Sequence, residues 1–383
     1  MASTSMFKAS KKPYLSAPYL LFPSTKQETY DHMESPDRSL FNLSEKTFYE
    51  SKHMFKGLEN AHCVGSSQGW LLVLDENAVP FIFNPFSSAR FQWPSFHLAW
   101  TPLLRQPCFL EYAQKHLISK AVLRCEWEPL CQIRRFIVII IFGFENNLAL
   151  CRSGETTWIP FPSSRSYSDM IFLKSQLYAV TNDGFLQVWG LEAWEPNRVF
   201  EVKLSIKVDE EEIRSFPADK FSARFYLVET KGRLLLVKRI IGDMVNSEGI
   251  AIDEAYLLES EDTHPLVCPY RTMHFYVYEI DSITGVCEKV ELLLNGEVLF
   301  VGGNESASLS AWVFRECEVN SIYFTDDRWD GVEDYLYGGH DLGIFNLQDK
   351  DVKRLIPYRY DRDKIEPAPI WIFPTPSSSF HQL

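Results

Sequence analysis

The sequence has few of the features that mark a helical, membrane-spanning or disulfide-stabilised protein. Almost no window of eleven or more residues carries an i, i+3, i+4 apolar stripe, which argues against a helix bundle. The most apolar run, residues 136–144, has under half the roughly twenty residues that a membrane helix needs, and it indicates a buried strand. The 8 cysteines follow no disulfide framework spacing. We therefore expect a reducing compartment, no secretory signal and no membrane partner.

Positive charge is also scarce, which bears on the class of partner. The formal net charge is −13, and the acidic run 209–212 has no basic counterpart of similar density. Binding to a phosphate backbone would lack its main driving force, so we expect no nucleic-acid partner. Neither of the glycine-rich motifs that cradle nucleotide phosphates is present. No cofactor is expected.

The stretch 170–191 instead predicts a β-hairpin. Residues 176–181 and 185–189 are rich in β-branched and aromatic side chains, and between them residues 181–184 (TNDG) supply a tight turn. A lone hairpin cannot bury its apolar face, so similar units should be stacked beside it.

Strand patterns of the same kind recur along the whole chain in groups of about fifty to sixty residues. The other strands are expected at 39–49, 70–74, 81–83, 91–93, 117–123, 135–142, 148–151, 157–159, 223–229, 233–241, 274–281, 286–290, 297–301, 321–325, 343–347 and 352–355. This spacing predicts an all-β fold, a β-propeller of about six or seven four-stranded antiparallel blades, with two β-sandwiches as the alternative. A short helical turn is expected at 209–214, and residues 243–269 are expected to form an insertion loop.

The predicted organisation has three parts. Residues 1–13 are a disordered tail or a short targeting segment, residues 14–376 a single propeller domain, and residues 377–383 a flexible tail. The predicted location is the cytoplasm or nucleus. A mitochondrion or plastid is the alternative if the lysine-bearing residues 1–12 act as a targeting signal.

Two segments could in principle carry catalytic side chains. Gly65 to Gly69 matches the G-x-S-x-G nucleophile elbow around Ser67, but a strand pattern follows where that elbow requires a helix. His340 stands beside Asp341, which could orient its imidazole, but no nucleophile lies near it in sequence. A turn in each place is the favoured interpretation. We expect no enzyme, with a serine hydrolase that uses Ser67 as the alternative.

Metal binding is not expected either. Cys125 and Cys131 lack the second ligand pair that would complete a zinc site. The acidic segment 326–330 has neither the alternate spacing nor the glutamate of a calcium loop, and a solvated loop is favoured.

An ordered set of strand and turn motifs resembles the KIB-type β-propellers of the plant F-box group. These motifs are CVGSSQGWLLVL at 63–74, FIFNPFSSARFQWP at 81–94, FLKSQLYAV at 172–180, FYVYEID at 275–281 and LFVGGNES at 299–306, followed by NSIYFTDD and GIFNLQD. The resemblance implies a non-catalytic domain that recognises a target protein, with a possible link to ubiquitin-ligase substrate recruitment. Family members commonly carry an amino-terminal F-box that docks a Skp-type adaptor. Residues 1–13 are too few for its three helices, so adaptor binding is doubtful.

The loop expected at 326–341 is the predicted partner-binding segment. Propellers usually recruit through loops on one face, and this loop is the richest in side chains that favour interfaces. Those side chains are Trp329, Tyr335, Tyr337 and His340. The alternative is that the loop folds back onto the propeller.

Overall fold

A computed structural model describes most of the 383-residue chain. It covers residues 18–22, 38–50, 54–55, 58, 61–96, 115–128, 133–246, 249–252, 270–327, 338–355, 365 and 368–374. The predicted tails at 1–13 and 377–383 lie outside these residues, as does most of the predicted insertion loop. The chain divides into two compact units. The first comprises 1–164, 303–305 and 369–383, and the second 165–302 and 306–368.

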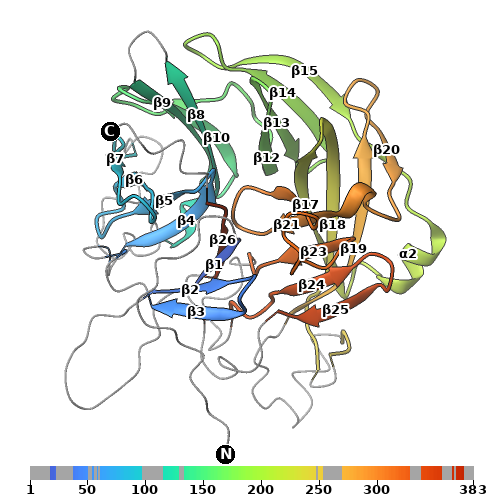
Figure 1. Cartoon of the computed structure of the whole chain (residues 1–383). Helices are drawn as coiled ribbons and strands as arrows, with labels where there is room; N and C mark the ends of the chain where they lie inside the picture. Colours follow the sequence, from blue (N-terminus) through green and yellow to red (C-terminus); the bar gives the residue numbers. More distant parts are fainter. Residues whose placement is uncertain are drawn as a thin grey trace, which may run out of the picture. The chain divides into compact units, whose positions relative to one another are not determined.

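The first unit contains three four-stranded antiparallel sheets among its described residues (Figure 1). One sheet has the order β26-β1-β2-β3, with β1 Tyr19–Phe22, β2 Ser39–Asn42, β3 Thr47–Glu50 and β26 Ile370–Ile372. The next is β4 His62–Ser67, β5 Trp70–Leu74, β6 Pro80–Phe83 and β7 Arg90–Gln92. The third is β8 Ile118–Glu128, β9 Ile133–Phe142, β10 Asn147–Arg152 and β11 Ile159–Pro160.

The second unit contains three further sheets in its described part. The first is β12 Tyr167–Leu173, β13 Gln176–Thr181, β14 Phe185–Gly190 and β15 Asn197–Lys203. The next has the order β16-β20-β19-β18-β17, with β16 Ser205–Ile206, β17 Phe221–Thr230, β18 Arg233–Gly242, β19 Arg271–Ile280 and β20 Val286–Lys289. The last has the order β22-β21-β23-β24-β25, with β21 Glu297–Val301, β22 Ala307–Ser310, β23 Ser321–Phe324, β24 Gly343–Asn346 and β25 Asp351–Arg354.

The six sheets confirm the predicted all-β propeller and give it six blades. Four blades are four-stranded and antiparallel throughout, and the other two each gain a fifth strand and one parallel pair, β16 with β20 and β21 with β23. In the last blade, β22 lies at one edge of the sheet and antiparallel to β21, and β23 lies on the other side of β21 and runs parallel to it.

The predicted hairpin at 176–189 is confirmed in β13 and β14. Its turn is held by Thr181, whose hydroxyl accepts a hydrogen bond from the Phe185 backbone N–H at 2.9 Å. Gly184 has φ +79°, a conformation that the predicted turn chemistry requires at this position. Local turn signals therefore set the register of this blade.

Two segments far apart in the sequence complete the first blade of the first unit. β26 pairs antiparallel with β1, with Leu20 opposite Trp371. Trp371 is fully buried, and the Ser66 hydroxyl of β4 donates a hydrogen bond to its carbonyl. The apolar strands YLLF and IWI therefore bury each other, and the blade contains strands from both ends of the described chain.

The predicted helical turn is confirmed as α2 Glu210–Ser215. Asp209 caps it by accepting a hydrogen bond from the Glu212 backbone N–H at 2.7 Å. Part of the acidic run 209–212 is buried, because Glu212 pairs with Lys238 of β18 at 2.6 Å.

Each unit has its own hydrophobic core, built from the inward faces of its strands. In the first unit, β9 confirms that residues 136–142 of the most apolar run form a buried strand. The described residues include no helix long and apolar enough to cross a membrane.

Candidate protein-interaction site

Both described ends of the predicted docking loop meet at one buried side chain of the second unit. Of the four predicted partner-binding residues, Trp329, Tyr335 and Tyr337 lie outside the described residues, and only His340 is described. The loop is entered through residues 325–327 after β23 and left through residues 338–342 before β24. Arg239 in the middle of β18 binds both of these ends.

Arg239 is 1% exposed and uses all three of its guanidinium nitrogens. On the entering side, Nη1 donates to the Thr325 carbonyl at 2.9 Å and to Asp327 Oδ1 at 3.1 Å. On the leaving side, Nη2 donates to Asp341 Oδ2 at 2.8 Å and to the Asp341 carbonyl at 3.1 Å. We call these contacts the Arg239 clamp.

Neighbouring strands of the same sheet position the clamp. Thr272 of β19 accepts from Arg239 Nε at 2.7 Å, and its backbone N–H donates to Asp341 at 3.0 Å. Tyr226 of β17 donates its hydroxyl to Asp327 Oδ2 at 2.8 Å. β17 and β19 flank β18, and Tyr226 and Thr272 lie opposite Val237 and Ile241, each two positions from Arg239. Tyr226 thus reaches Asp327, and Thr272 reaches Asp341. The clamp is therefore supported by three adjacent strands.

A second contact fixes the two loop ends to each other. Tyr270 donates to Asp326 Oδ2 at 2.7 Å, and the Asp341 backbone N–H donates to the same oxygen at 3.2 Å. Close packing holds the leaving end, because a Cβ added at Gly339 would lie 2.1 Å from the Ile365 carbonyl oxygen. Gly339 has φ +79°, so it also needs the freedom of glycine.

The electrostatics of the clamp keep Arg239 cationic. Burial acts to lower its pKa, but the Tyr226 hydroxyl and the carboxylates of Asp341 and Asp327 raise the pKa well above its ordinary value. Burial, together with the Asp327 charge, raises the pKa of the Tyr226 hydroxyl, which therefore stays a neutral donor. The site is a buried charged network whose donors and acceptors match.

His340 does not share its neighbour's carboxylate in the way that a catalytic pair would. Both oxygens of Asp341 face Thr272, and one of them also binds Arg239. His340 itself is partly exposed, at the edge of the loop. His340 therefore lies at the C-terminal end of the predicted docking loop, and Asp341 is part of the Arg239 clamp.

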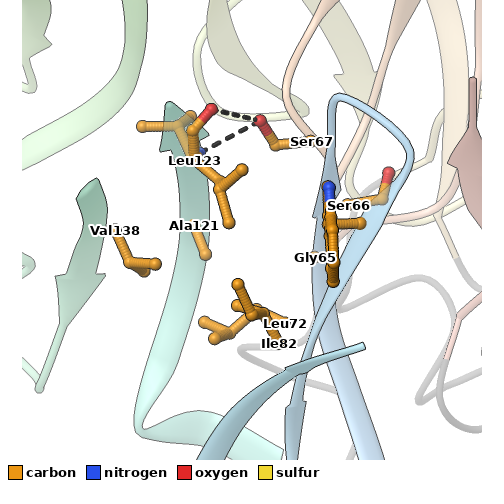
Figure 2. A pocket seen from close by; sticks show the side chains of 10 residues that line it. Gly65, Ser66, Ser67, Leu72, Ile82, Ala121, Leu123 and Val138 are labelled. Atoms are coloured by element: carbon orange, nitrogen blue, oxygen red, sulfur yellow. Dashed lines mark hydrogen bonds between the residues drawn. The ribbon is translucent and has the colours of Figure 1, made fainter. Parts of the chain in front are cut away.

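Ser67 lies in a hairpin, without the strand–turn–helix geometry of a nucleophile elbow. It ends β4, and Gln68 and Gly69, both with positive φ, turn the chain directly into β5. Its hydroxyl accepts from the Leu123 N–H at 3.0 Å and lies 2.9 Å from the Leu123 carbonyl, as Figure 2 shows, and it also contacts Glu305. The cavity beside it has a volume of about 10 Å³, which is barely room for one water.

The residues considered as metal ligands in the sequence are only partly described by the structure. No group of three or more His, Cys, Asp or Glu side chains within the described ranges could hold a metal ion. Asp326 and Asp327 bind Tyr270 and Arg239 instead. Cys125 forms no disulfide with another described cysteine, and Cys131 lies outside the described residues.

Arg239 was not among the predicted site residues, although the alternation of residues in β18 contains a signal for it. Positions 235, 237, 239 and 241 share one face, and all but Arg239 are apolar. A charged residue on an otherwise apolar, buried face predicts a buried ion pair. The pattern does not say which carboxylates complete the pair.

Comparison with known proteins identifies the family. The model of the KIB1-4 beta-propeller family matches residues 40–346, and the chain therefore belongs to this family. A putative F-box protein of Arabidopsis thaliana is 21% identical over 268 residues, which make up 69% of this chain and 64% of that protein. The match thus spans slightly less than two thirds of the relative's length.

Solved structures show only remote similarity. The N-terminal domain of Nup159 has a TM-score of 0.35 at 11% identity, with 95% of this chain and 89% of that chain covered. The β-propeller domain of Myceliophteria thermophila Cps50 (Swd1) has a TM-score of 0.33 at 12% identity, with 84% and 79% covered. A chain of an S. cerevisiae Dbp5 complex with Nup159 and Gle1 has a TM-score of 0.32 at 12% identity, with 80% of this chain and 65% of that chain covered.

Proposed function

We propose that the chain is a non-catalytic protein-recognition module that recruits a target protein through the loop 326–341, as the recognition domain of a plant F-box protein would. Membership of the KIB1-4 beta-propeller family and the match to a putative F-box protein support this class of function. The observation that carries the choice of loop is the Arg239 clamp, which binds the loop on both sides.

A clamped loop suits recognition for an energetic reason. Binding residues work best on loops that a rigid scaffold positions, because ordering a loop during association costs free energy. Arg239 joins Asp327 to Asp341 before any partner arrives. Trp329, Tyr335 and Tyr337 belong to residue types that dominate binding energy at interfaces, and His340 lies at the described end of the same loop. We propose that these four side chains contact the target.

The environments of three described side chains, Ser67, Cys151 and Cys317, favour a non-catalytic function. The Ser67 hydroxyl is hydrogen-bonded to the backbone of a neighbouring strand. Burial raises the pKa of Cys151 and of Cys317 to about 12, so neither thiol forms an appreciable amount of thiolate near neutral pH. A chromogenic ester screen should detect no turnover. Turnover that Ser67→Ala abolishes would contradict the proposal.

We place the protein in the cytoplasm or nucleus. Five cysteines among the described residues are free thiols, as a reducing compartment favours. A fluorescent fusion should distribute between cytoplasm and nucleus whether or not residues 1–12 are present. Accumulation in mitochondria or plastids that requires residues 1–12 would establish the alternative.

The loop assignment is tested by target capture followed by a measurement with purified proteins. The tagged chain is used to capture proteins from plant extract, mass spectrometry identifies them, and binding of the purified candidate is measured by calorimetry. Trp329→Ala should weaken binding at least about tenfold, as loss of an interface hot spot does, with the melting temperature nearly unchanged.

Trp194→Ala provides the matched control, because Trp194 is a 63% exposed tryptophan of another blade in the same unit. It should leave capture intact. Equal binding by the Trp329→Ala variant and the wild type would refute the loop assignment, and unfolding of the Trp329→Ala variant would identify Trp329 as a core residue.

The link to a ubiquitin ligase is tested separately. We propose that the propeller itself does not bind a Skp-type adaptor, and we expect the 383-residue polypeptide to elute apart from the purified adaptor in size-exclusion chromatography. Co-elution would show that the adaptor docks on this polypeptide and would leave the loop assignment untouched.

A further inference from the structure

A second tryptophan of the second unit is displayed on the surface in a fixed orientation. Trp312 follows β22 and is 72% exposed, yet its indole Nε1 donates to the Asn295 carbonyl at 2.9 Å. The ring lies against Gly296, where an added Cβ would meet Nε1 at 2.6 Å. Asn295 and Gly296 both have positive φ, and the lack of a side chain at Gly296 leaves room for the indole. The ring is thus ordered although most of its surface faces solvent.

Other apolar side chains accompany Trp312 at this end of the β21–β25 blade. Their exposed fractions are 73% for Val313, 55% for Leu294, 52% for Leu292 and 51% for Val319. Hydrogen bonds draw the turns that bear them together. The Leu293 N–H donates to the Asn320 side chain at 2.7 Å, and the Asn320 N–H donates to the Glu297 carbonyl at 3.3 Å. We call these five exposed residues the Trp312 patch.

Exposed apolar residues that gather in this way usually mark an interaction site. An exposed tryptophan that is already ordered loses little conformational freedom when a partner covers it. Trp312 therefore has the properties of an interface hot spot before any partner binds.

The residues around the Trp312 patch carry a net negative charge, which favours a positively charged partner. The two segments that bear it, 288–296 and 311–319, contain the acids Glu288, Glu291, Glu316 and Glu318 and the bases Lys289 and Arg315, a local net charge of −2. Lys289 pairs with Asp209 at 3.4 Å and with Glu291 at 3.5 Å, and Glu318 pairs with Lys353 at 2.9 Å. When the two outside partners, Asp209 and Lys353, are included, the local net charge is still −2. The whole chain carries −13, so a cationic partner is attracted both locally and over longer range.

We propose that the Trp312 patch docks a basic segment of a partner protein, with a large apolar side chain of that segment on the patch and Lys or Arg beside it. The exposed indole face also favours cations, because a lysine or arginine held over a tryptophan ring is attracted to it. A second copy of this chain suits the surface less well, because a symmetric contact would bring the same acidic side chains face to face. The site is separate from the loop 326–341 and does not depend on the function proposed for that loop.

The test begins with a random peptide library displayed on phage, selected on the full chain and counter-selected on the Trp312→Ala variant. Enriched peptides should combine an aliphatic or aromatic residue with Lys or Arg. Synthetic copies should bind the wild type in a fluorescence anisotropy titration. Their affinity should fall at least about tenfold with Trp312→Ala and be unaffected by Trp194→Ala.

Charge reversal gives a second measurement that does not disturb the indole. Glu291→Lys and Glu316→Lys, both at exposed positions, should together lower the affinity for the peptides about three- to tenfold at low salt. At about 1 M salt the affinities of this double variant and the wild type should differ less. Trp312→Phe, which keeps an apolar ring and loses the bond to Asn295, should fall between the wild type and Trp312→Ala.

Several results would overturn the proposal. The phage selection could enrich no peptides, or it could enrich acidic ones. In the titration, the Trp312→Ala variant could bind the peptides as tightly as the wild type. Sedimentation that shows a dimer of the wild type and a monomer of the Trp312→Ala variant would instead assign the patch to a second copy of the chain.

Discussion

Replacing Arg239 with methionine should destabilise the protein far more than an ordinary surface substitution. The change removes a guanidinium and retains an apolar side chain of similar length. It leaves the carboxylates of Asp327 and Asp341, which are 9% and 5% exposed, without their main counter-charge. Breaking a buried pair from one side costs about 3–5 kcal/mol, most of it from the stranded charge.

The remaining contacts place the expected loss toward the lower part of that range. Asp327 keeps the Tyr226 hydroxyl at 2.8 Å, and Asp341 keeps the Thr272 backbone N–H at 3.0 Å. A loss of about 3–4 kcal/mol follows. With an unfolding entropy of about 2.1 cal/mol/K per residue, it corresponds to a fall in melting temperature of about 4–5 °C for a chain of 383 residues.

Urea unfolding followed by circular dichroism measures this loss, and a double-mutant cycle assigns it to the ion pair. Arg239→Met combined with Asp341→Asn should cost less than the two single substitutions added together, with a coupling of about 1–3 kcal/mol. Arg224→Met is the matched control. Arg224 lies 3.9 Å from Asp327 with its side chain 30% exposed, so its loss should cost under about 1 kcal/mol. An Arg239→Met cost as small as the control, or strict additivity in the cycle, would refute the clamp.

Two further predictions concern protonation and backbone packing in the second unit. Burial lowers the pKa of His274 to about 4 from an ordinary value of 6.5, so the unfolded chain takes up this proton first and stability falls as the pH drops below about 7. Between pH 7 and 5, His274→Phe should lose less stability than the wild type in urea unfolding, by about 1 kcal/mol after allowance for solvent screening, and equal losses would contradict this. Gly339→Ala should cost at least about 2 kcal/mol because its Cβ would meet the Ile365 carbonyl at 2.1 Å, whereas Gly232→Ala, with a similar φ and open space around it, should cost about 1 kcal/mol. Equal melting temperatures for the two glycine variants would remove the argument from close packing.

Features encoded by neighbouring residues could be predicted from the sequence. The hairpin of β13 and β14 follows from its TNDG turn. The helix α2 begins at Glu210 because Asp209 before it is a favourable N-cap residue. Pairings between distant segments could not be predicted in this way. Nothing in YLLF or IWI specifies that β1 and β26 pair with each other, since both are ordinary apolar strands.

The candidate sites show the same division. The aromatic content of 326–341 favoured that loop, but the clamp at its two described ends depends on Arg239 of β18, about ninety residues earlier in the chain. A tryptophan is equally easy to find in the sequence at position 312 and at position 329. The sequence does not predict that Trp312 is exposed and packed on Gly296, because this depends on the contact between the turn at Asn295 and the end of β22.

The pairing of β1 with β26 also has a consequence for synthesis of the chain. β1 leaves the ribosome about 350 residues before its partner, which at about 5–20 residues per second is a delay of tens of seconds. During that time the apolar edge of β1 has no neighbour on the side that β26 later covers, and such an edge can pair with other nascent chains. The first blade is therefore completed only after translation of residues 370–372, and a chain interrupted shortly before them would leave this edge permanently open.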